Sequence, residues 1–139
     1  MDPARENRVR EIFNRANFIC DLGIELVRVD DGICETTLIP SERHRQQHGL
    51  IHAGVLATMA DHTAGGAAGS ILDGRGDVLS IEFKINFLRP AIADRLRCQA
   101  QVLRGGKTII VAESEVFAEK DGQEKLVSKA TVTLAVREI

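Results

Sequence analysis

The chain has 139 residues, of which 44% are hydrophobic and 27% charged, a composition that suits one domain with its own core and hardly two. A net charge of −2 and the absence of Trp and Tyr argue against a nucleic-acid-binding surface. Neither a membrane span nor a secretion signal is indicated, because the longest apolar stretch is interrupted and the N-terminus is charged, so we expect a cytoplasmic protein without a membrane partner.

The pattern of cysteines also favours a cytoplasmic protein. They are odd in number, far apart in the sequence and never arranged as CxxC, which favours buried apolar side chains in a reducing environment over a disulfide or zinc framework. They are Cys20, Cys34 and Cys98.

The first third of the chain predicts a helix followed by a β-hairpin. From Pro3 to Asn17 the apolar residues fall on one helical face, with Asp2 as the cap, so we expect an amphipathic helix on the outside. Gly23 ends the helical region. Two short strands then follow, joined by the turn Asp30-Asp31-Gly32. Their expected ranges are Ile24–Val29 and Ile33–Ile39.

The most apolar stretch runs from His52 to Ser70, follows a polar loop and contains no proline. Because it is apolar on nearly every face, it predicts a central helix of about five turns that other structure encloses. One carboxylate, Asp61, lies in its middle. An acidic side chain there needs either a partner for its charge or a functional role, since burying an unpaired carboxylate is costly. The segment Asp73–Asp77 is expected to be a loop.

The remainder of the chain predicts strands. Four runs alternate apolar and polar residues, and short turns join them, which favours an antiparallel sheet. The runs are Leu79–Phe87, Leu96–Val102, Thr108–Ala118 and Leu126–Val136. We therefore predict one α+β domain over residues 1–139, in which an antiparallel sheet of about six strands wraps around the central helix.

Two stretches of the sequence resemble a known family. His48 to Gly54, HGLIHAG, together with Thr58 and Asp61, resembles the HGG…D signature of acyl-CoA thioesterases of the phenylacetate-pathway type, which have the hotdog fold. Residues 80–91, SIEFKINFLRPA, resemble that family's third strand and its closing proline. The resemblance covers about residues 20–136 and leaves the N-terminal helix, residues 1–20, outside it.

The resemblance implies a site that hydrolyses the thioester of a medium-chain or aromatic acyl-CoA without a further cofactor. Asp61 matches the catalytic carboxylate, which acts as nucleophile or as the base for a water molecule. His52 matches the motif histidine. Ala53 stands where the family has a glycine whose N–H points at the thioester oxygen, and an alanine still supplies that N–H.

The remaining site residues follow from the same comparison and from local position. Gln46 stands where related enzymes place an amide side chain, with Gln47 as the competing choice, and Ser80 stands where several members have a hydroxyl near the attacking water. Three further residues are candidates for substrate binding. These are Gly54 at the helix N-terminus, Gly65 one turn beyond Asp61, and Lys107 toward a coenzyme A phosphate.

The chemistry also predicts the assembly. N–H groups at a helix N-terminus suit the negative charge that develops on a thioester oxygen. Yet His52 and Asp61 are nine residues apart, which on one helix means roughly 13 to 14 Å of rise and about half a turn of rotation. One subunit's carboxylate must therefore meet another subunit's helix N-terminus, in a homodimer or a homotetramer that pairs through the strand at Ile81 to Phe87.

Other interpretations stay open. The spacing of His44, His48 and His52 would align three metal ligands on a helix, although no HExxH motif is present and we expect no metal. The sequence GGKT at Gly105–Thr108 resembles a phosphate loop, but it lies between two strands and fits a hairpin turn better. For the function, the alternatives are a hotdog dehydratase of 3-hydroxyacyl or enoyl thioesters, and a non-catalytic acyl-CoA-binding module.

Overall fold

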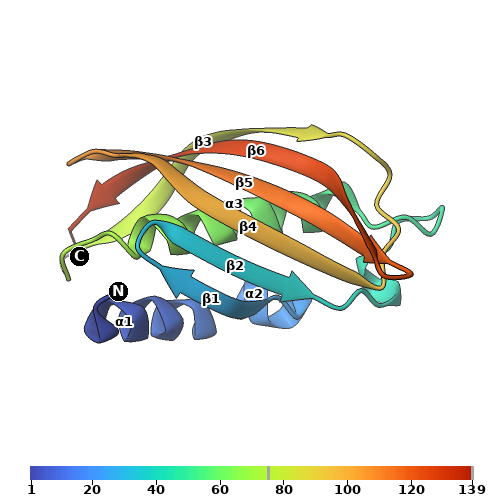
Figure 1. Cartoon of the computed structure of the whole chain (residues 1–139), viewed down its shortest axis with the longest axis horizontal. Helices are drawn as coiled ribbons and strands as arrows, with labels where there is room; N and C mark the ends of the chain where they lie inside the picture. The colour runs from blue at the N-terminus through green and yellow to red at the C-terminus, as the bar shows by residue number, and fades with distance from the viewer. Residues whose placement is uncertain (75, 139) are drawn as a thin grey trace.

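The computed structural model describes residues 1–74 and 76–138, and it shows one antiparallel sheet wrapped around a central helix (Figure 1). The helix, α3, is Ala53–Gly69. The strands are β1 (Glu25–Asp30), β2 (Ile33–Leu38), β3 (Asp77–Phe87), β4 (Arg95–Gly105), β5 (Ile109–Lys120) and β6 (Gln123–Arg137). Their order in the sheet is β1-β2-β4-β5-β6-β3, and all neighbours are antiparallel. The predicted α+β hotdog arrangement is confirmed.

α3 begins and ends close to its predicted bounds. His52 caps it with extended backbone, and Ser70 follows its last residue. The prediction that the helix is enclosed on every side is wrong, however, because the sheet covers only one of its faces. The opposite face carries small or polar residues and stays exposed or half-exposed. The residues of this open face are Gly54, Ala57, Thr58, Asp61 and Gly65.

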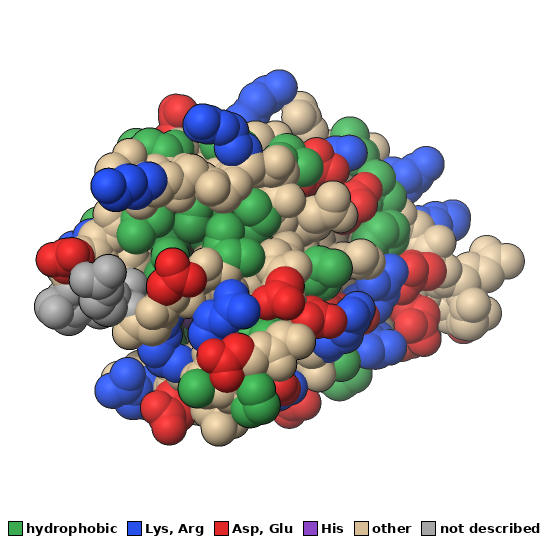
Figure 2. Space-filling view, turned by 60° about the vertical axis from the view of Figure 1, so that its left-hand side comes forward, with side chains coloured by type: hydrophobic (Ala, Val, Ile, Leu, Met, Phe, Trp, Pro, Cys, Tyr) green, Lys and Arg blue, Asp and Glu red, His purple; other side chains and the backbone are tan. Residues whose placement is uncertain are grey.

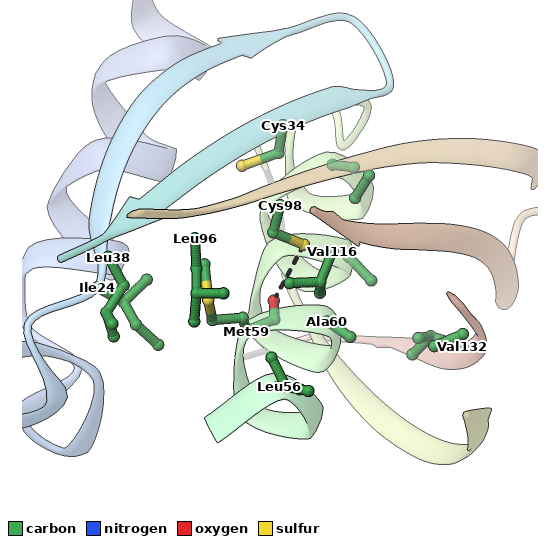
Figure 3. Close-up of a cluster of buried hydrophobic side chains, with 14 of the residues drawn as sticks. Ile24, Cys34, Leu38, Leu56, Met59, Ala60, Leu96, Cys98, Val116 and Val132 are labelled. Carbon is green, nitrogen blue, oxygen red and sulfur yellow. Dashed lines mark hydrogen bonds between the residues drawn. The ribbon is translucent and has the colours of Figure 1, made fainter. Parts of the chain in front are cut away.

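The core lies between α3 and the inner face of the sheet (Figure 3). Two buried polar contacts fix the helix in place there. The hydroxyls of Thr36 and Thr63 lie 2.7 Å apart, and the Ser114 hydroxyl donates to the carbonyl oxygen of Ala60 at 2.7 Å. Because a buried hydroxyl without a partner is costly, these contacts favour one position of α3 along the sheet.

Two of the cysteines belong to this core. Cys34 and Cys98 are fully buried, and burial raises the pKa of each thiol to about 12. The prediction is wrong for Cys20, which is exposed. It lies on a short helix whose buried residue is Ile19, so its own side chain points away from the core.

The N-terminal segment forms two helices where one was predicted. α1 is Pro3–Asn14, capped by Asp2 as expected, and α2 is Asn17–Leu22, ended by Gly23 in the left-handed conformation. The break allows Phe13 and Ile19 to enter the same core, where each is about 5% exposed or less. In a continuous helix, six residues would place them on different faces.

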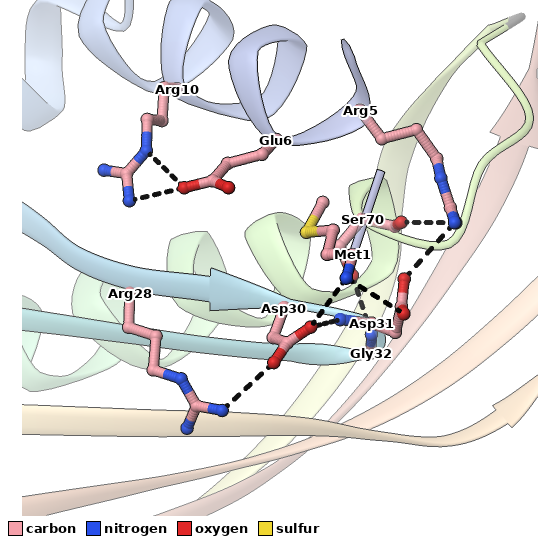
Figure 4. A network of polar contacts seen from close by, with 9 residues as sticks. All are labelled: Met1, Arg5, Glu6, Arg10, Arg28, Asp30, Asp31, Gly32 and Ser70. Atoms are coloured by element: carbon pink, nitrogen blue, oxygen red, sulfur yellow. Dashed lines mark hydrogen bonds and ion pairs between the residues drawn. The ribbon is translucent and has the colours of Figure 1, made fainter. Parts of the chain in front are cut away.

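The start of the chain is tied to the β1–β2 turn and to the end of α3 (Figure 4). The terminal amino group lies 3.8 Å from carboxylate oxygens of Asp30 and Asp31, and Arg5 lies 3.3 Å from Asp31. Arg5 also donates to the carbonyl oxygen of Ser70 at 3.0 Å. These contacts hold α1 alongside α3.

β3 is an edge strand, and its alternation is interrupted. A bulge falls between Ser80 and Glu82, so that Ile81 has no partner in β6. Ser80 before the bulge and Phe83 and Ile85 after it therefore all face α3, whereas strict alternation would have put Ser80 on the opposite face from the other two. Of the predicted loop before β3, Arg75 lies outside the described residues.

Several large hydrophobic side chains remain exposed along and beside β3. They include Leu79, Ile81, Phe83, Phe87 and Leu88, which are 39% to 58% exposed. Figure 2 shows hydrophobic side chains gathered in a hollow of one face of the molecule, with charged side chains around them. Across residues 1–74 and 76–138, no helix is both long and apolar enough to cross a membrane.

Candidate functional site

Asp61 and Ser80 meet between the open face of α3 and the edge strand β3. The Ser80 hydroxyl donates to Oδ1 of Asp61 at 2.6 Å. The bulge at Ile81 makes this contact possible, because it turns Ser80 toward the helix. The carboxylate is half-exposed, and within the described part of the chain its second oxygen, Oδ2, has no hydrogen-bond partner. Asp61 therefore has an oriented carboxylate with one oxygen available to a ligand.

The N-terminus of α3 presents one backbone donor. The N–H of Gly54 donates to Nδ1 of His52 at 2.8 Å, and the N–H of Val55 donates to the carbonyl oxygen of His52 at 3.0 Å. In the described residues the N–H of Ala53 makes no hydrogen bond, and Ala53 is exposed. The donor that remains for a ligand is thus the N–H of Ala53, while the N–H of Gly54 binds the ring of the capping residue His52.

Gln46 and Gln47 lie beside this helix end. The Gln46 side-chain oxygen accepts the N–H groups of His48 and Leu50 and so shapes the loop, while Gln47 is exposed. Both line a cavity of about 580 Å³ together with His52 and Ala53. The structure thus gives Gln46 a loop-forming contact that the sequence did not indicate.

A second cavity, of about 300 Å³, adjoins the carboxylate. It is lined by Asp61, Ser80 and Gly65, and by apolar residues of α1 and β3. The predicted site residues fall into two groups, one in each cavity. The structure thus separates Asp61, Ser80 and Gly65 from Gln46, His52 and Ala53. Within one chain, the eight positions from Ala53 to Asp61 correspond to about 12 Å along the helix.

The three spaced histidines lie in different environments. His44 is buried, and its ring nitrogens lie 2.9 Å from the backbone N of Ser41 and 2.6 Å from the carbonyl oxygen of Leu22. His48 is exposed in a turn, and His52 caps α3. They do not share one helix face. Lys107 is exposed at the β4–β5 turn and lines neither cavity described above.

His62 is a residue of the site that the sequence reading missed. It follows Asp61 on α3, and its ring packs edge-on against Phe13 of α1, with the centroids 4.4 Å apart. Burial lowers the pKa of its imidazole, and the neighbouring Asp61 charge opposes that shift. The available signal was a histidine among small residues directly after the motif aspartate.

Comparison with known proteins identifies the family. The model of the thioesterase superfamily matches residues 48–125. A thioesterase family protein from Silicibacter pomeroyi is 33% identical, and its crystal structure superimposes with a TM-score of 0.95 over 97% of this chain and 99% of that chain. The chain belongs to the thioesterase superfamily. It is a thioester hydrolase, and the resemblance indicated by the HGLIHAG motif is confirmed.

Two further proteins are similar to this chain. The 1,4-dihydroxy-2-naphthoyl-CoA hydrolase of Listeria monocytogenes is 29% identical over 116 residues, which cover 84% of this chain and 92% of the relative. The PaaI protein from the phenylacetic acid degradation operon of Escherichia coli is 23% identical, with a TM-score of 0.86 over 96% of this chain and 93% of that chain. At that identity the second likeness shows the fold alone.

Proposed function

We propose that this superfamily member is an acyl-CoA thioesterase that converts a medium-chain or aromatic acyl-CoA to the free acid and coenzyme A. The observation that carries the proposal is the hydrogen-bonded pair of Asp61 and Ser80 at the mouth of a largely apolar cavity. A carboxylate with one oxygen held and the other available is suited to act on a carbonyl carbon, and the cavity offers an apolar place for the acyl group.

In the proposed reaction, Asp61 acts on the thioester carbonyl in one of two ways. Its Oδ2 attacks the carbonyl carbon and forms an anhydride that water then hydrolyses, or it takes a proton from a water molecule that attacks directly. In both cases the C–S bond breaks, the acid gains oxygen from water and the thiol leaves with a proton. The Ser80 hydroxyl donates a hydrogen bond to Oδ1 and so orients the carboxylate.

The negative charge on the thioester oxygen needs a donor, and we propose the N–H of Ala53. This N–H lies at the positive end of the α3 dipole and has no partner in the described residues. Gly54 contributes indirectly, because its N–H fixes the ring of His52 beside that donor. Gln46 and Gln47 line the same cavity and are proposed to contact the thioester or the coenzyme A portion.

Because the two halves of the site lie about 12 Å apart along α3, one subunit does not bring them together. We propose a two-fold dimer in which Asp61 and Ser80 of one subunit face Ala53 and His52 of the other. The exposed hydrophobic residues of β3 and the open face of α3 support this arrangement, because both lie beside the carboxylate. A dimer of such dimers is a second stage of the same proposal.

The test is a panel of benzoyl-, phenylacetyl- and hexanoyl-CoA, incubated with the protein and a thiol reagent. We expect thiol release, and Asp61→Asn should lower kcat by about 10²- to 10⁴-fold, because Asn keeps the size but neither attacks a carbonyl nor takes a proton. Circular dichroism and sedimentation should show the same fold and assembly for both proteins.

Other outcomes would contradict the proposal. A spectral change of an enoyl or 3-hydroxyacyl thioester without thiol release would favour a dehydratase, and binding without any turnover would favour an acyl-CoA-binding module. Wild-type turnover in Asp61→Asn would show that the carboxylate has been misassigned.

A further inference from the structure

We propose that the cavity between α1, α3 and β3 binds the acyl group, and that its length selects a straight medium-chain acyl group over a single aromatic ring. The inference rests on the proposed function, because it takes Asp61 as the group at the thioester carbonyl. It concerns the cavity of about 300 Å³ described above, to which α1 contributes Val9, Ile12 and Phe13. The N-terminal helix thereby becomes part of the substrate site.

Contacts between the two helices show how the cavity is oriented. Phe13 packs against His62, which is next to Asp61, whereas Val9 lies near Gly69 at the other end of α3. α1 therefore runs antiparallel to α3, and Arg5 holds its far end through the carbonyl oxygen of Ser70 (Figure 4). The cavity follows both helices, with the carboxylate at one end and Val9 at the other.

The length of the cavity fits an alkyl chain. From Asp61 to Gly69, both of which line it, α3 advances by eight residues, or about 12 Å. An extended chain advances about 1.2 Å per bond, so about ten bonds fit along this distance. A single ring would leave much of the far end empty.

The lining is apolar beyond the carboxylate end, apart from Asp77. Gly65 lies in the middle of the α3 wall, and a Cβ built there meets no atom within 4 Å. The space beside Gly65 therefore belongs to the cavity, and a Cβ at this position enters it without displacing a neighbouring atom. At the far end, Val9 limits the depth, since a Cβ on Gly69 would lie 3.6 Å from its Cγ2.

The experiment compares kcat/KM for butyryl-, hexanoyl-, octanoyl-, decanoyl- and benzoyl-CoA in three variants and the wild type. The wild type should prefer octanoyl- or decanoyl-CoA to benzoyl-CoA. Gly65→Val should lower the ratio of kcat/KM for octanoyl-CoA to that for butyryl-CoA by about tenfold or more, because the outer methylene groups of the longer chain can no longer be buried in the cavity. Val9→Ala should move the preference toward longer chains by about one or two carbons, while Val27→Ala, at an exposed position of β1, should leave the order of preference as it is.

Binding of non-hydrolysable S-alkyl-CoA thioethers, measured by calorimetry, separates the cavity from the chemistry. Affinity should rise from S-butyl to S-octyl in the wild type and lose that rise in Gly65→Val. A preference for benzoyl-CoA, or an equal effect of Gly65→Val on all chain lengths, would overturn the assignment of the cavity and leave the thioesterase standing. If no acyl-CoA is hydrolysed, the proposed function fails. Thioether affinities that do not depend on chain length would overturn the assignment of the cavity to the acyl group as well.

Discussion

The hydroxyl of Ser80 makes the one side-chain hydrogen bond to the carboxylate of Asp61 in the described residues. A hydrogen bond to a charged group stabilises the pair by about 1.5 to 3 kcal/mol, and here it holds Oδ1 and leaves Oδ2 available to the substrate. We expect Ser80→Ala to lower kcat by about ten- to a hundredfold with a smaller change in KM. The matched control is Ser128→Ala, because the buried Ser128 hydroxyl has no partner in the described part of the chain. Equal kcat values for Ser80→Ala and the wild type would remove Ser80 from the mechanism.

The burial of His62 makes stability depend on pH. Since the folded state lowers the pKa of this imidazole below its ordinary value of 6.5, the unfolded chain binds the proton more readily. Its contribution to stability is complete above pH 6.5 and is lost as the pH falls from there through the lowered pKa. Urea unfolding at pH 5 to 8 should show a weaker pH dependence in His62→Gln than in the wild type. His48→Gln, at an exposed position, should keep the wild-type dependence, and an unchanged profile in His62→Gln would contradict the prediction.

Within α3, two adjacent glycines serve opposite purposes. A Cβ at Gly66 would lie 2.6 Å from Sγ of Cys34 on β2, so this glycine allows close packing of helix and sheet. We expect Gly66→Ala to lower the free energy of unfolding by about 1 to 3 kcal/mol, the cost of overpacking a core. Gly65→Ala is the control, since its Cβ meets open space, and it should raise that free energy by up to about 1 kcal/mol through helix propensity. Urea denaturation measures the free energy of unfolding of both variants. Equal changes would show that the packing around Cys34 rearranges to accept the added methyl group.

For the whole molecule, the separation of Ala53 from Asp61 predicts an assembly in which activity is shared between subunits. We expect a dimer or a tetramer in sedimentation at micromolar concentration. Homo-oligomers of Asp61→Asn should be inactive because they lack the carboxylate, and those of Ala53→Pro because they lack the N–H donor. The first position of a helix accepts proline, so the second change should leave the fold intact. A purified mixed dimer of the two should recover one working site in two.

That mixed dimer is also the sharpest control for the assembly. Its active site combines the intact Ala53 of one subunit with the intact Asp61 of the other, whereas its second site lacks both groups. A fully active monomer, or a folded mixed dimer with no recovered activity, would contradict the shared site.

The sequence by itself determined those features that depend on neighbouring residues. The periodicity of apolar residues predicts all six strands to within a few residues, and the apolar stretch after His52 predicts α3 with Asp61 in its middle. The motif around His48 to Gly54 predicts the family, which the comparisons show. Such features are local, because helix periodicity, strand alternation and turn residues all act over a few positions.

Only the tertiary structure decided the features that depend on distant parts of the chain. The bulge at Ile81, which brings Ser80 to Asp61, arises from pairing with β6, and the break between α1 and α2 arises because Phe13 and Ile19 share one core. The cavity beside Asp61 is bounded on one side by α1, which packs antiparallel to α3. These outcomes rest on long-range packing of side chains whose local patterns are compatible with more than one arrangement, so they appear only when the elements are placed against each other.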